Sequence, residues 1–555
     1  MYQGKIYNIT NPIDYKKGRE IMQNNIKDML YRMVAVQSDT GTSKEVGMAE
    51  YIYEIMKEQK YFIENPELCG KFYNNDFLNR PVIWALHRGK TDKTLILTGH
   101  YDAVEIDCYG ALKEYALKPD ELREKLKLIH IGEDAMKDLD DPNWCFGRGI
   151  NDMKAGVAIN IDAVSDEIDE DLNVLFIAVH DEENLSAGMR QSTKLLCELK
   201  EKYNLDYKLM LITEPHIRNE EDKFKIFVGT VGKIMPAILV KGRIAHGSDV
   251  MEGLNSTVIM SEIITGIELN PDLCSTDMRM TTPPPTVLYS RDLKEIYDVS
   301  VPEFSSLYLN YQFLKSKTPF QIIDELKSIC QDSFSKVIDK YNNAYRKLDD
   351  KNSLNGKKRR EYKPLVYTFE ELEKAADERN KDYRKLKDEL YSSVYEKVKN
   401  NKITIQDAGV LILKKVIELS MINEPLIVIG FIPPYYPPAN NSYLKNNNEA
   451  YADCIEGVIK DSYGLTLEKD NYFMGICDGS YASLTDRKSE ENVMSNMVTP
   501  REIYDIPFEY IEKISCPFIV VGPWGKDYHT ITERVYMKDV EIIVPDLIRK
   551  VAKIL

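Results

Sequence analysis

The stretch that decides the fold of this chain is Leu95-Ile96-Leu97-Thr98-Gly99-His100-Tyr101-Asp102-Ala103-Val104. Its apolar first part predicts a buried strand that ends at the glycine. A histidine follows at once. Two residues later a carboxylate stands where it can hydrogen-bond the far ring nitrogen of the imidazole and fix its tautomer. Taken alone, this pattern fits either a metal-binding or catalytic histidine or an ordinary polar strand end.

The same arrangement recurs twice further along the chain. A strand predicted at 173–179 ends in His180-Asp181-Glu182-Glu183, and one at 208–212 ends in Thr213-Glu214-Pro215-His216. Helices predicted at 153–166 and 187–201 connect these strands in the alternating order of an α/β fold. Because ligands of open α/β sheets bind at the carboxyl ends of strands, we expect these polar groups to lie together.

Two more polar groups come from turn segments. In residues 147–156, Gly-Arg-Gly-Ile-Asn-Asp-Met-Lys-Ala-Gly, small residues surround Asp152, so the backbone can pack closely while the carboxylate points inward. A strand predicted at 517–521 leads into Asp527-Tyr528-His529-Thr530. We also predict helices at 14–34, 44–57, 447–461 and 538–553, strands at 81–87 and 94–99, and an irregular loop over the site at 108–143.

The middle of the chain has a different character. Strand-like stretches at 234–241, 286–291 and 305–314 surround a helix that begins at Asn255-Ser256, which predicts a smaller inserted α+β domain. Residues 316–420 are highly charged and helical, with a capping box of Thr368 and Glu371. A strand at 425–432 runs into Pro433–Pro438, interpreted as a stiff hinge. We therefore expect a catalytic domain from 1–228 and 439–555, and an inserted domain at 229–438.

Composition limits the partners of the chain. The net charge of -16 argues against nucleic acid and anionic membranes, which would repel the protein, and no apolar run reaches membrane-spanning length. The basic tetrad at 357–360 is therefore better interpreted as a solvated turn than as a nucleic-acid contact. Nine dispersed cysteines without a CxxC pair, and a start without a secretory signal, indicate a cytoplasmic protein with reduced thiols.

Seven polar groups thus converge on one edge of the predicted sheet. Carboxylates gathered in this way would repel one another unless a cation neutralised them. Imidazoles and carboxylates without thiolates suit zinc, cobalt or manganese, and a shared carboxylate can bridge two ions about 3.5–4 Å apart. The converging groups are His100, Asp102, Asp152, Glu182, Glu183, Glu214 and His529.

These segments also support a resemblance to a known family. In this order, GHYDAV, GRGINDMKAG, HDEEN, TEP and DYHT resemble the di-zinc metallopeptidase and deacylase family, which contains aminoacylase, glutamate carboxypeptidase and succinyl-diaminopimelate desuccinylase. Residues 281–314 and the charged insertion look most like its arginine-utilisation branch. The resemblance covers nearly the whole chain except about 320–420. It implies a mixed sheet sandwiched by helices, with an inserted α+β lid and dimerisation domain.

The resemblance also implies a role for each of the converging residues. His100 and Glu214 would hold one metal ion, Glu183 and His529 the other, and Asp152 would bridge the two ions. Asp102 would orient His100. Glu182 would be the general base, taking a proton from the reacting water and passing it to the leaving amine. Spacing alone leaves open the opposite assignment, with Glu183 as base and Glu182 as ligand.

Two segments of the inserted domain also match family motifs. In Ile244-Ala245-His246-Gly247-Ser248 the histidine would stabilise the tetrahedral oxyanion, often across a dimer; a packing role for His246 remains the alternative. In Gly253-Leu254-Asn255 the asparagine would help to bind substrate, or act only as a helix N-cap. Departures from the family pattern at Asp249-Val250 and at 475–479 concern substrate contacts rather than metal ligands.

The sequence therefore predicts a cytoplasmic two-metal amidohydrolase that contains zinc, or else cobalt or manganese. It would cleave the N-acyl or ureido C–N bond of an amino-acid derivative, and the resemblance places it in arginine or ornithine catabolism. The expected partners are a small-molecule substrate and a second copy bound through the lid. The alternatives are a dipeptidase or aminopeptidase, and a metal-binding scaffold without activity. Retention of Glu182 argues against the scaffold, since binding alone needs no base.

Overall fold

The computed structural model of the chain describes residues 25–165, 170–218, 220–349, 359–447 and 449–555. Several interpretations from the sequence lie partly or wholly outside these residues. They are the start of the helix predicted at 14–34, the N-terminal segment free of a secretory signal, the end of the helix predicted at 153–166, part of the charged insertion with Lys357 and Lys358, and one residue of the helix predicted at 447–461. The described part of that first helix is α1 (Ile26–Ala35).

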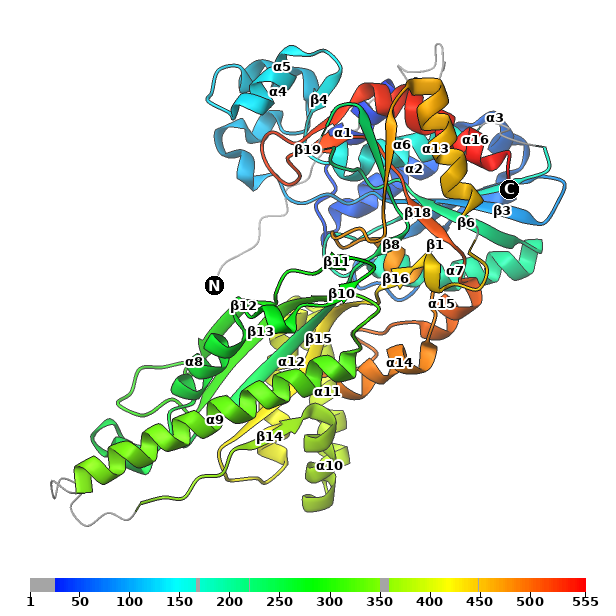
Figure 1. Cartoon of the computed structure of the whole chain (residues 1–555). Coiled ribbons are helices and arrows are strands. Elements are labelled where there is room, and N and C mark those ends of the chain that lie inside the picture. Colours follow the sequence, from blue (N-terminus) through cyan, green and yellow to red (C-terminus); the bar gives the residue numbers. More distant parts are fainter. Residues whose placement is uncertain (1–24, 166–169, 219, 350–358, 448) are drawn as a thin grey trace, which may run out of the picture.

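The larger of the two main sheets has parallel strands at its centre (Figure 1). β3 pairs in parallel with β5 on one side and with β6 on the other, and β18 continues the parallel set beyond β6. Their carboxyl ends therefore meet at one edge, while β1, β2 and β7 make antiparallel contacts. The strand order is β1 (Cys69–Phe72), β2 (Val82–His87), β5 (Asn173–Val179), β3 (Lys93–His100), β6 (Asp206–Ile212), β18 (Phe518–Val520), β7 (Lys223–Phe227) and β17 (Thr466–Asp470).

Helices cover both faces of this sheet. α6 (Ala155–Ser165) connects β3 to β5, and α7 (Ala187–Tyr203) returns across β3 to β6. Because both crossovers are right-handed but run in opposite directions along the sheet, the two helices lie on opposite faces, as Figure 1 shows. On one side, α1 and α16 (Val544–Ala552) pack on α6, and α16 also contacts α13 (Ala450–Tyr463). α2 (Lys44–Glu58) packs on β1 and β2. α15 (Phe508–Ile514) packs on α7.

A small sheet joins two segments that are far apart in the sequence. β4 (Trp144–Phe146) pairs with β20 (Arg534–Tyr536), which pairs with β19 (Gly525–Lys526). Residues 107–143 pack on this sheet and contain α4 (Pro119–Leu126) and α5 (Glu133–Asp140). The prediction of an irregular loop at 108–143 was therefore wrong: its sparse apolar residues, among them Leu122, Leu126 and Leu139, are buried against Trp144 and Trp524.

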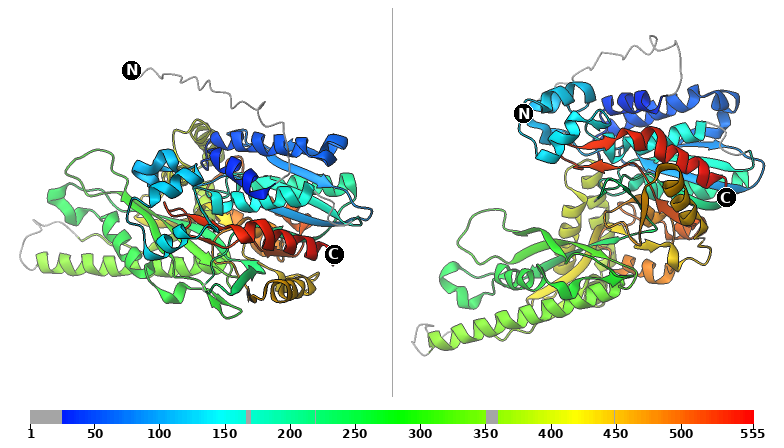
Figure 2. Two further views of the ribbon diagram at one scale, coloured as in Figure 1. Left: turned by 90° about the horizontal axis from the view of Figure 1, so that it is seen from above. Right: turned by 45° about the horizontal axis from the view of Figure 1, so that its top comes forward.

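The second main sheet belongs to residues 232–436, which we call the arm and which project away from the larger sheet (Figures 1 and 2). Its central strand β9 is buried on both faces, because alternate residues contribute to two different apolar clusters. The strand order is β12 (Thr286–Asp292), β13 (Phe304–Phe313), β9 (Gly232–Lys241), β15 (Leu426–Tyr436) and β14 (Leu365–Thr368).

Helices cover both faces of the arm sheet, and all of them except α8 come from the charged insertion. α8 (Ser256–Ile267) and the long α9 (Pro319–Asp349) pack together on the face that contains Ile234 and Ile238 of β9. The opposite face, with Met235 and Leu239, is covered by α10 (Phe369–Arg379), α11 (Tyr383–Lys399) and α12 (Ile405–Leu419). The capping box of Thr368 and Glu371 at the start of α10 is present.

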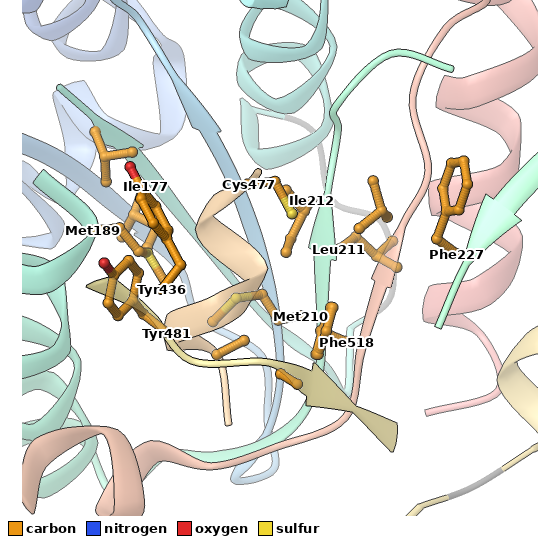
Figure 3. Close-up of a cluster of buried hydrophobic side chains, with 14 of the residues drawn as sticks. Ile177, Met189, Met210, Leu211, Ile212, Phe227, Tyr436, Cys477, Tyr481 and Phe518 are labelled. Carbon is orange, nitrogen blue, oxygen red and sulfur yellow. The ribbon is translucent and has the colours of Figure 1, made fainter. Parts of the chain in front are cut away.

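The proline-rich segment is not a hinge. β15 continues through Pro433 and Pro434 to Tyr436, and all its residues are buried. The register with β9 is interrupted between Ile432 and Tyr436. Pro433 and Pro434 lie in this interruption, so their lack of N–H groups removes no hydrogen bond between the two strands. Tyr436 instead reaches the core of the larger sheet, where its ring lies 5.6 Å from that of Tyr481, next to side chains of β5, β6 and α7 (Figure 3).

Two further properties concern the chain as a whole. Within the described ranges, none of the helices combines the length and the apolarity that crossing a membrane requires. All nine cysteines are free thiols.

Candidate metal centre

Four of the candidate site residues lie at or just beyond the ends of neighbouring parallel strands. His100 is the last residue of β3, Glu182 and Glu183 follow the end of β5, and Glu214 follows β6. Since β5, β3 and β6 are adjacent in that order, these side chains converge at the carboxyl edge of the sheet. His100 Nε2 lies 3.6 Å from Glu214 Oε1 and 3.9 Å from Glu182 Oε2.

The remaining ligands come from the small sheet. Asp152 follows β4, and His529 lies in the loop between β19 and β20, so the pairing of β4 with β20 brings them together. Asp152 Oδ1 lies 3.0 Å from His100 Nε2, and Oδ2 lies 3.3 Å from His529 Nε2. One carboxylate thus stands between two imidazoles. His529 Nε2 also contacts Glu183 Oε1 at 2.9 Å.

Among the residues that the structure describes, two groups of side chains have the chemistry and spacing to hold a metal ion: His100 with Asp152 and Glu183, and His100 with Glu182 and Glu214. Within each group the ligand atoms lie within 4.8 Å of one another. These are nitrogen and oxygen donors, with no thiolate, as zinc, cobalt or manganese require. The groups overlap at His100, so both belong to one centre.

The electrostatics of the centre favour the binding of a cation. Burial raises the pKa of Glu182 and of Glu214 well above the usual value of a carboxyl group. Hydrogen bonds to Asp152 and Glu183 raise the pKa of His529 to about 10. Ionised carboxylates are therefore disfavoured here without a nearby positive charge, which a cation held by these groups would supply.

The sequence of the chain also matches a known protein family. The sequence model of the family described as "Peptidase family M20/M25/M40" matches residues 96–544. This range includes all the candidate ligands of the centre. The chain belongs to peptidase family M20/M25/M40. It is therefore a metal-dependent hydrolase acting on C–N bonds, so the predicted family and enzyme class are confirmed.

Two proteins of Bacillus subtilis are similar to this chain over most of its length. The chain is 30% identical to the uncharacterized protein YqjN of Bacillus subtilis (strain 168) over 532 residues, covering 94% of each. It is 28% identical to protein RocB of the same organism, covering 93% of this chain and 92% of RocB.

Solved structures support the fold. An M20 family metallo-carboxypeptidase, Sso-CP2 from Sulfolobus solfataricus, has a TM-score of 0.52 at 12% identity and covers 96% of this chain and 99% of its own. The di-peptidase Dug1p from Saccharomyces cerevisiae has a TM-score of 0.51 at 10% identity, covering 95% and 96%. The predicted mixed α/β fold is confirmed.

In this M20/M25/M40 centre, Asp102 links His100 to the turn after β5. Its two carboxylate oxygens accept hydrogen bonds from the main-chain N–H groups of Glu182 (3.2 Å) and Glu183 (3.3 Å). The nearest acceptor to His100 Nδ1 is the main-chain oxygen of Asp102 at 3.0 Å, with its carboxylate at 3.5 Å. Asp102 therefore orients His100 mainly through its backbone, and its side chain fixes the two glutamates.

A buried ion cluster stabilises the same turn. Arg80 donates hydrogen bonds to Glu45 (2.7 Å), Asp181 (2.8 Å) and Asp76 (2.7 Å). Glu45 also accepts from the main-chain N–H of Asp181 at 2.9 Å. Asp181 has a φ of 66°, a left-handed conformation that a non-glycine residue holds only with support. Arg80 thus fixes the residue immediately before Glu182.

The sequence did not predict the Arg80 cluster, although the position of Glu45 is a signal for it. The helix predicted at 44–57 has a core face of Met48, Ala49, Ile52 and Met56, and Glu45 lies on that same face. A glutamate on the apolar face of an amphipathic helix is almost never fully buried unless it is paired, so it indicates an ion partner in the core.

A second buried ion pair holds the small sheet to the centre. Arg148 and Glu533 pair with each other, with side chains 2% and 1% exposed. Glu533 accepts from the main-chain N–H of Asp152 at 3.4 Å, and Arg148 donates to the main-chain oxygen of His529 at 3.1 Å. One ion pair therefore connects the two candidate ligands that come from distant parts of the sequence.

The other histidines of these motifs have different surroundings. Burial lowers the pKa of His180 to about 3, so this ring is neutral in the core. His216 Nδ1 lies 2.9 Å from the carbonyl oxygen of Gly522, and its Nε2 accepts from Arg218. Both side chains are buried, and these surroundings fit structural roles.

The arm residues His246 and Asn255 do not join the centre. His246 is exposed, and its Nδ1 accepts from the main-chain N–H of Ser248 at 3.2 Å. Asn255 is the N-cap of α8 and accepts from the N–H of Thr257 at 2.9 Å, which is the capping alternative. Neither residue lines the cavity of about 720 Å³ that opens next to Glu182 and Glu214.

The Arg80 cluster predicts a large loss of stability when its cation is removed. Arg80→Met should lower the free energy of unfolding by about 3–5 kcal/mol, because it leaves buried carboxylates without a counter-charge. Lys137→Met is the control, since its ion pair with Glu221 is exposed to solvent and its loss should change the free energy of unfolding little. Denaturant unfolding of both variants measures the difference, and equal losses would contradict the structural role of Arg80.

Proposed function

We propose that the protein is a two-metal amidohydrolase that cleaves the N-acyl or ureido C–N bond of an amino-acid derivative. The observation that carries the proposal is the position of Asp152, whose two oxygens face two different imidazoles. A carboxylate in that position, surrounded by further acidic side chains, suits a bridge between two cations.

The contacts support one division of the ligands. Glu214 lies beside His100, whereas Glu183 lies beside His529, and Asp152 contacts both imidazoles. We assign His100 and Glu214 to one ion, Glu183 and His529 to the other, and Asp152 to both. Zinc fits these donors, and cobalt or manganese would also suit them.

Glu182 is the proposed general base. When bound, the ions supply Lewis-acid polarisation and make water acidic enough to react at neutral pH. Glu182 accepts the proton of the attacking water and passes it to the leaving amine. Its buried carboxyl group, whose pKa is raised by burial, is suited to hold a proton between these two steps. The Asp102 carboxylate keeps Glu182 in position by accepting a hydrogen bond from the main-chain N–H of Glu182.

The substrate class rests on the cavity and on the family. A dipeptidase or aminopeptidase would need a free acidic group for the substrate's α-amine. Among the described lining residues outside the centre, Asp470 is the one carboxylate, and Lys225 pairs with it at 3.2 Å. We therefore favour an N-acyl or ureido amino acid. The likeness of residues 281–314 to the arginine-utilisation branch supports a place in arginine or ornithine catabolism.

The setting of the enzyme follows from its composition. The net charge of -16 disfavours nucleic acid as a partner. Nine free thiols suit the reducing cytoplasm, which we propose as its location.

The arm is the proposed lid and dimerisation domain. In this proposal, residues 229–438 form that domain on a catalytic domain of 1–228 and 439–555. His246 lies outside the cavity of its own chain, which suits a role in the centre of a second copy. Apolar side chains exposed near it would then be covered: Ile244, Val250, Ile296, Tyr297 and Val299.

The first prediction from this function is hydrolysis. The metal-loaded protein should cleave N-acyl amino acids or ureido acids in preference to dipeptides, measured as release of the free amino acid. Cleavage of dipeptides alone would favour the peptidase alternative, and no hydrolysis of any amide would favour a scaffold.

Two glutamine variants are the controls for that activity. Glu182→Gln should keep both metal ions and lower kcat by about 10²–10⁴, the usual contribution of a general base. Glu183→Gln should lose one ion. The reverse pattern in metal content would assign the base to Glu183 instead.

The second prediction concerns the arm. His246→Ala should lower kcat by about 10²–10³ if the imidazole stabilises the oxyanion, without changing the unfolding midpoint, since His246 is exposed. A dimer by analytical ultracentrifugation is expected. A monomer with normal kcat in the variant would return His246 to a packing role.

A further inference from the structure

His529 is covered less by neighbouring atoms than the other candidate ligands. Its side chain is 47% exposed, whereas those of the others are 17% exposed or less. Its backbone has a φ of 62°, and Asp527, two residues before it, has a φ of 55°. Left-handed conformations of non-glycine residues persist only where the surrounding structure holds them. The position of this imidazole therefore depends on what holds the loop between β19 and β20.

The hairpin of β19 and β20 brings two positive charges together. Lys526 and Arg534 are directly paired residues of these antiparallel strands, so their side chains point to the same face. Like charges directly opposite each other destabilise such a pair of strands, and Arg534 is fully buried. The hairpin that carries His529 therefore needs negative charges over this face.

Helix α5 supplies those negative charges. Asp134 and Asp138 are four residues apart, so they lie on one face of the helix. Arg534 donates through Nε to Asp138 Oδ2 and through Nη2 to Asp134 Oδ2, each at 2.6 Å. Lys526 Nζ donates to the same Asp138 oxygen at 2.8 Å and to Asp134 Oδ2 at 3.0 Å. Both cations of the hairpin are thus paired with the same two acids of α5.

Arg534 also closes the loop itself. Its Nη1 donates to the Asp527 carboxylate and, at 3.0 Å, to the main-chain oxygen of Thr532. The Asp527 carboxylate accepts a second hydrogen bond from the Thr532 hydroxyl at 2.7 Å. Asp527 and Thr532 stand on either side of His529 in the sequence. One guanidinium therefore connects both ends of the ligand loop to α5.

Apolar contacts fix α5 and the guanidinium relative to each other. Ala135 and Leu139 of α5 are buried in one apolar cluster with Trp144 and Phe146 of β4, which α5 overlies (Figure 1). The Arg534 guanidinium lies 5.6 Å from the ring of Trp144 and 5.7 Å from that of Phe146. Rings thus confine the guanidinium while acids take its N–H groups, which is an arrangement that a lysine cannot reproduce.

We propose that Arg534 is a positioning residue of the metal centre: it fixes the loop of His529 against α5 and thereby sets the affinity for the ion that Glu183 and His529 hold. This inference rests on the proposed function, which supplies the two ions. It gives residues 107–143 a task in building the centre, although their described contacts with it pass through the hairpin.

The experiment measures zinc affinity rather than turnover. Zn²⁺ is titrated into the metal-free protein in competition with a chelator, and the wild type should bind two ions. Arg534→Met should weaken one of them by about 10–100-fold, the usual effect of losing a group that orients a metal ligand, and leave the other unchanged.

A second background identifies the weakened ion. His529→Gln should lose one ion site, and adding Arg534→Met to it should leave the affinity for the remaining ion unchanged. Residues that act through the same ligand show this loss of additivity, whereas a general loosening of the fold would weaken the remaining ion as well.

Arg549→Met is the matched control. It removes an arginine whose ion pair with Asp162, at 2.8 Å, connects α16 to α6, so both ions should bind normally. Thermal unfolding verifies that each variant is folded. Asp134→Asn serves if Arg534→Met does not fold, since the Asp134 side chain is 66% exposed, and it should weaken the same ion to a smaller extent.

Three results would overturn the inference: unchanged affinity for both ions in Arg534→Met, equal weakening of both, or weakening of the remaining ion in the His529→Gln background. A wild type that binds a single ion would instead contradict the proposed function. The effect of Arg534→Met on that single ion would still decide whether Arg534 positions a ligand.

Discussion

The structure depends on the cost of burying several carboxylates together. Asp152, Glu182, Glu183 and Glu214 converge where three parallel strands end, and in a poorly solvated space their charges cannot all persist without cations. His100 and His529 take part of that role through their raised pKa values. Two divalent ions would take all of it. The geometry of the site follows from this single electrostatic requirement.

The surrounding elements hold the segments that carry the acidic side chains in place. Arg80 holds the turn after β5 from one side, and the ion pair of Arg148 with Glu533 holds the Asp152 and His529 segments from the other. Both interactions are buried, so removing one partner costs far more than breaking a surface ion pair. The arm adds the last element, because β15 carries Tyr436 to the backbone of Glu182. Preorganisation of this kind keeps ligand positions when the charge changes.

The sequence predicted the parts of this arrangement that depend on local pattern. His100, Glu182 and Glu214 follow apolar strands, and strand ends in an α/β sheet converge by topology. It did not predict α4 and α5, whose apolar residues are few, nor that Pro433 lies inside a strand, because an interruption of register belongs to the pairing and not to the residue.

The most direct test of the account is the anomalous scattering of crystals of the metal-loaded protein, recorded at the absorption edge of the bound metal. A two-metal centre predicts two peaks about 3.5–4 Å apart with Asp152 between them. His100 and Glu214 should lie at one peak, and Glu183 and His529 at the other. A single peak, or two peaks that do not share Asp152, would contradict the two-metal centre.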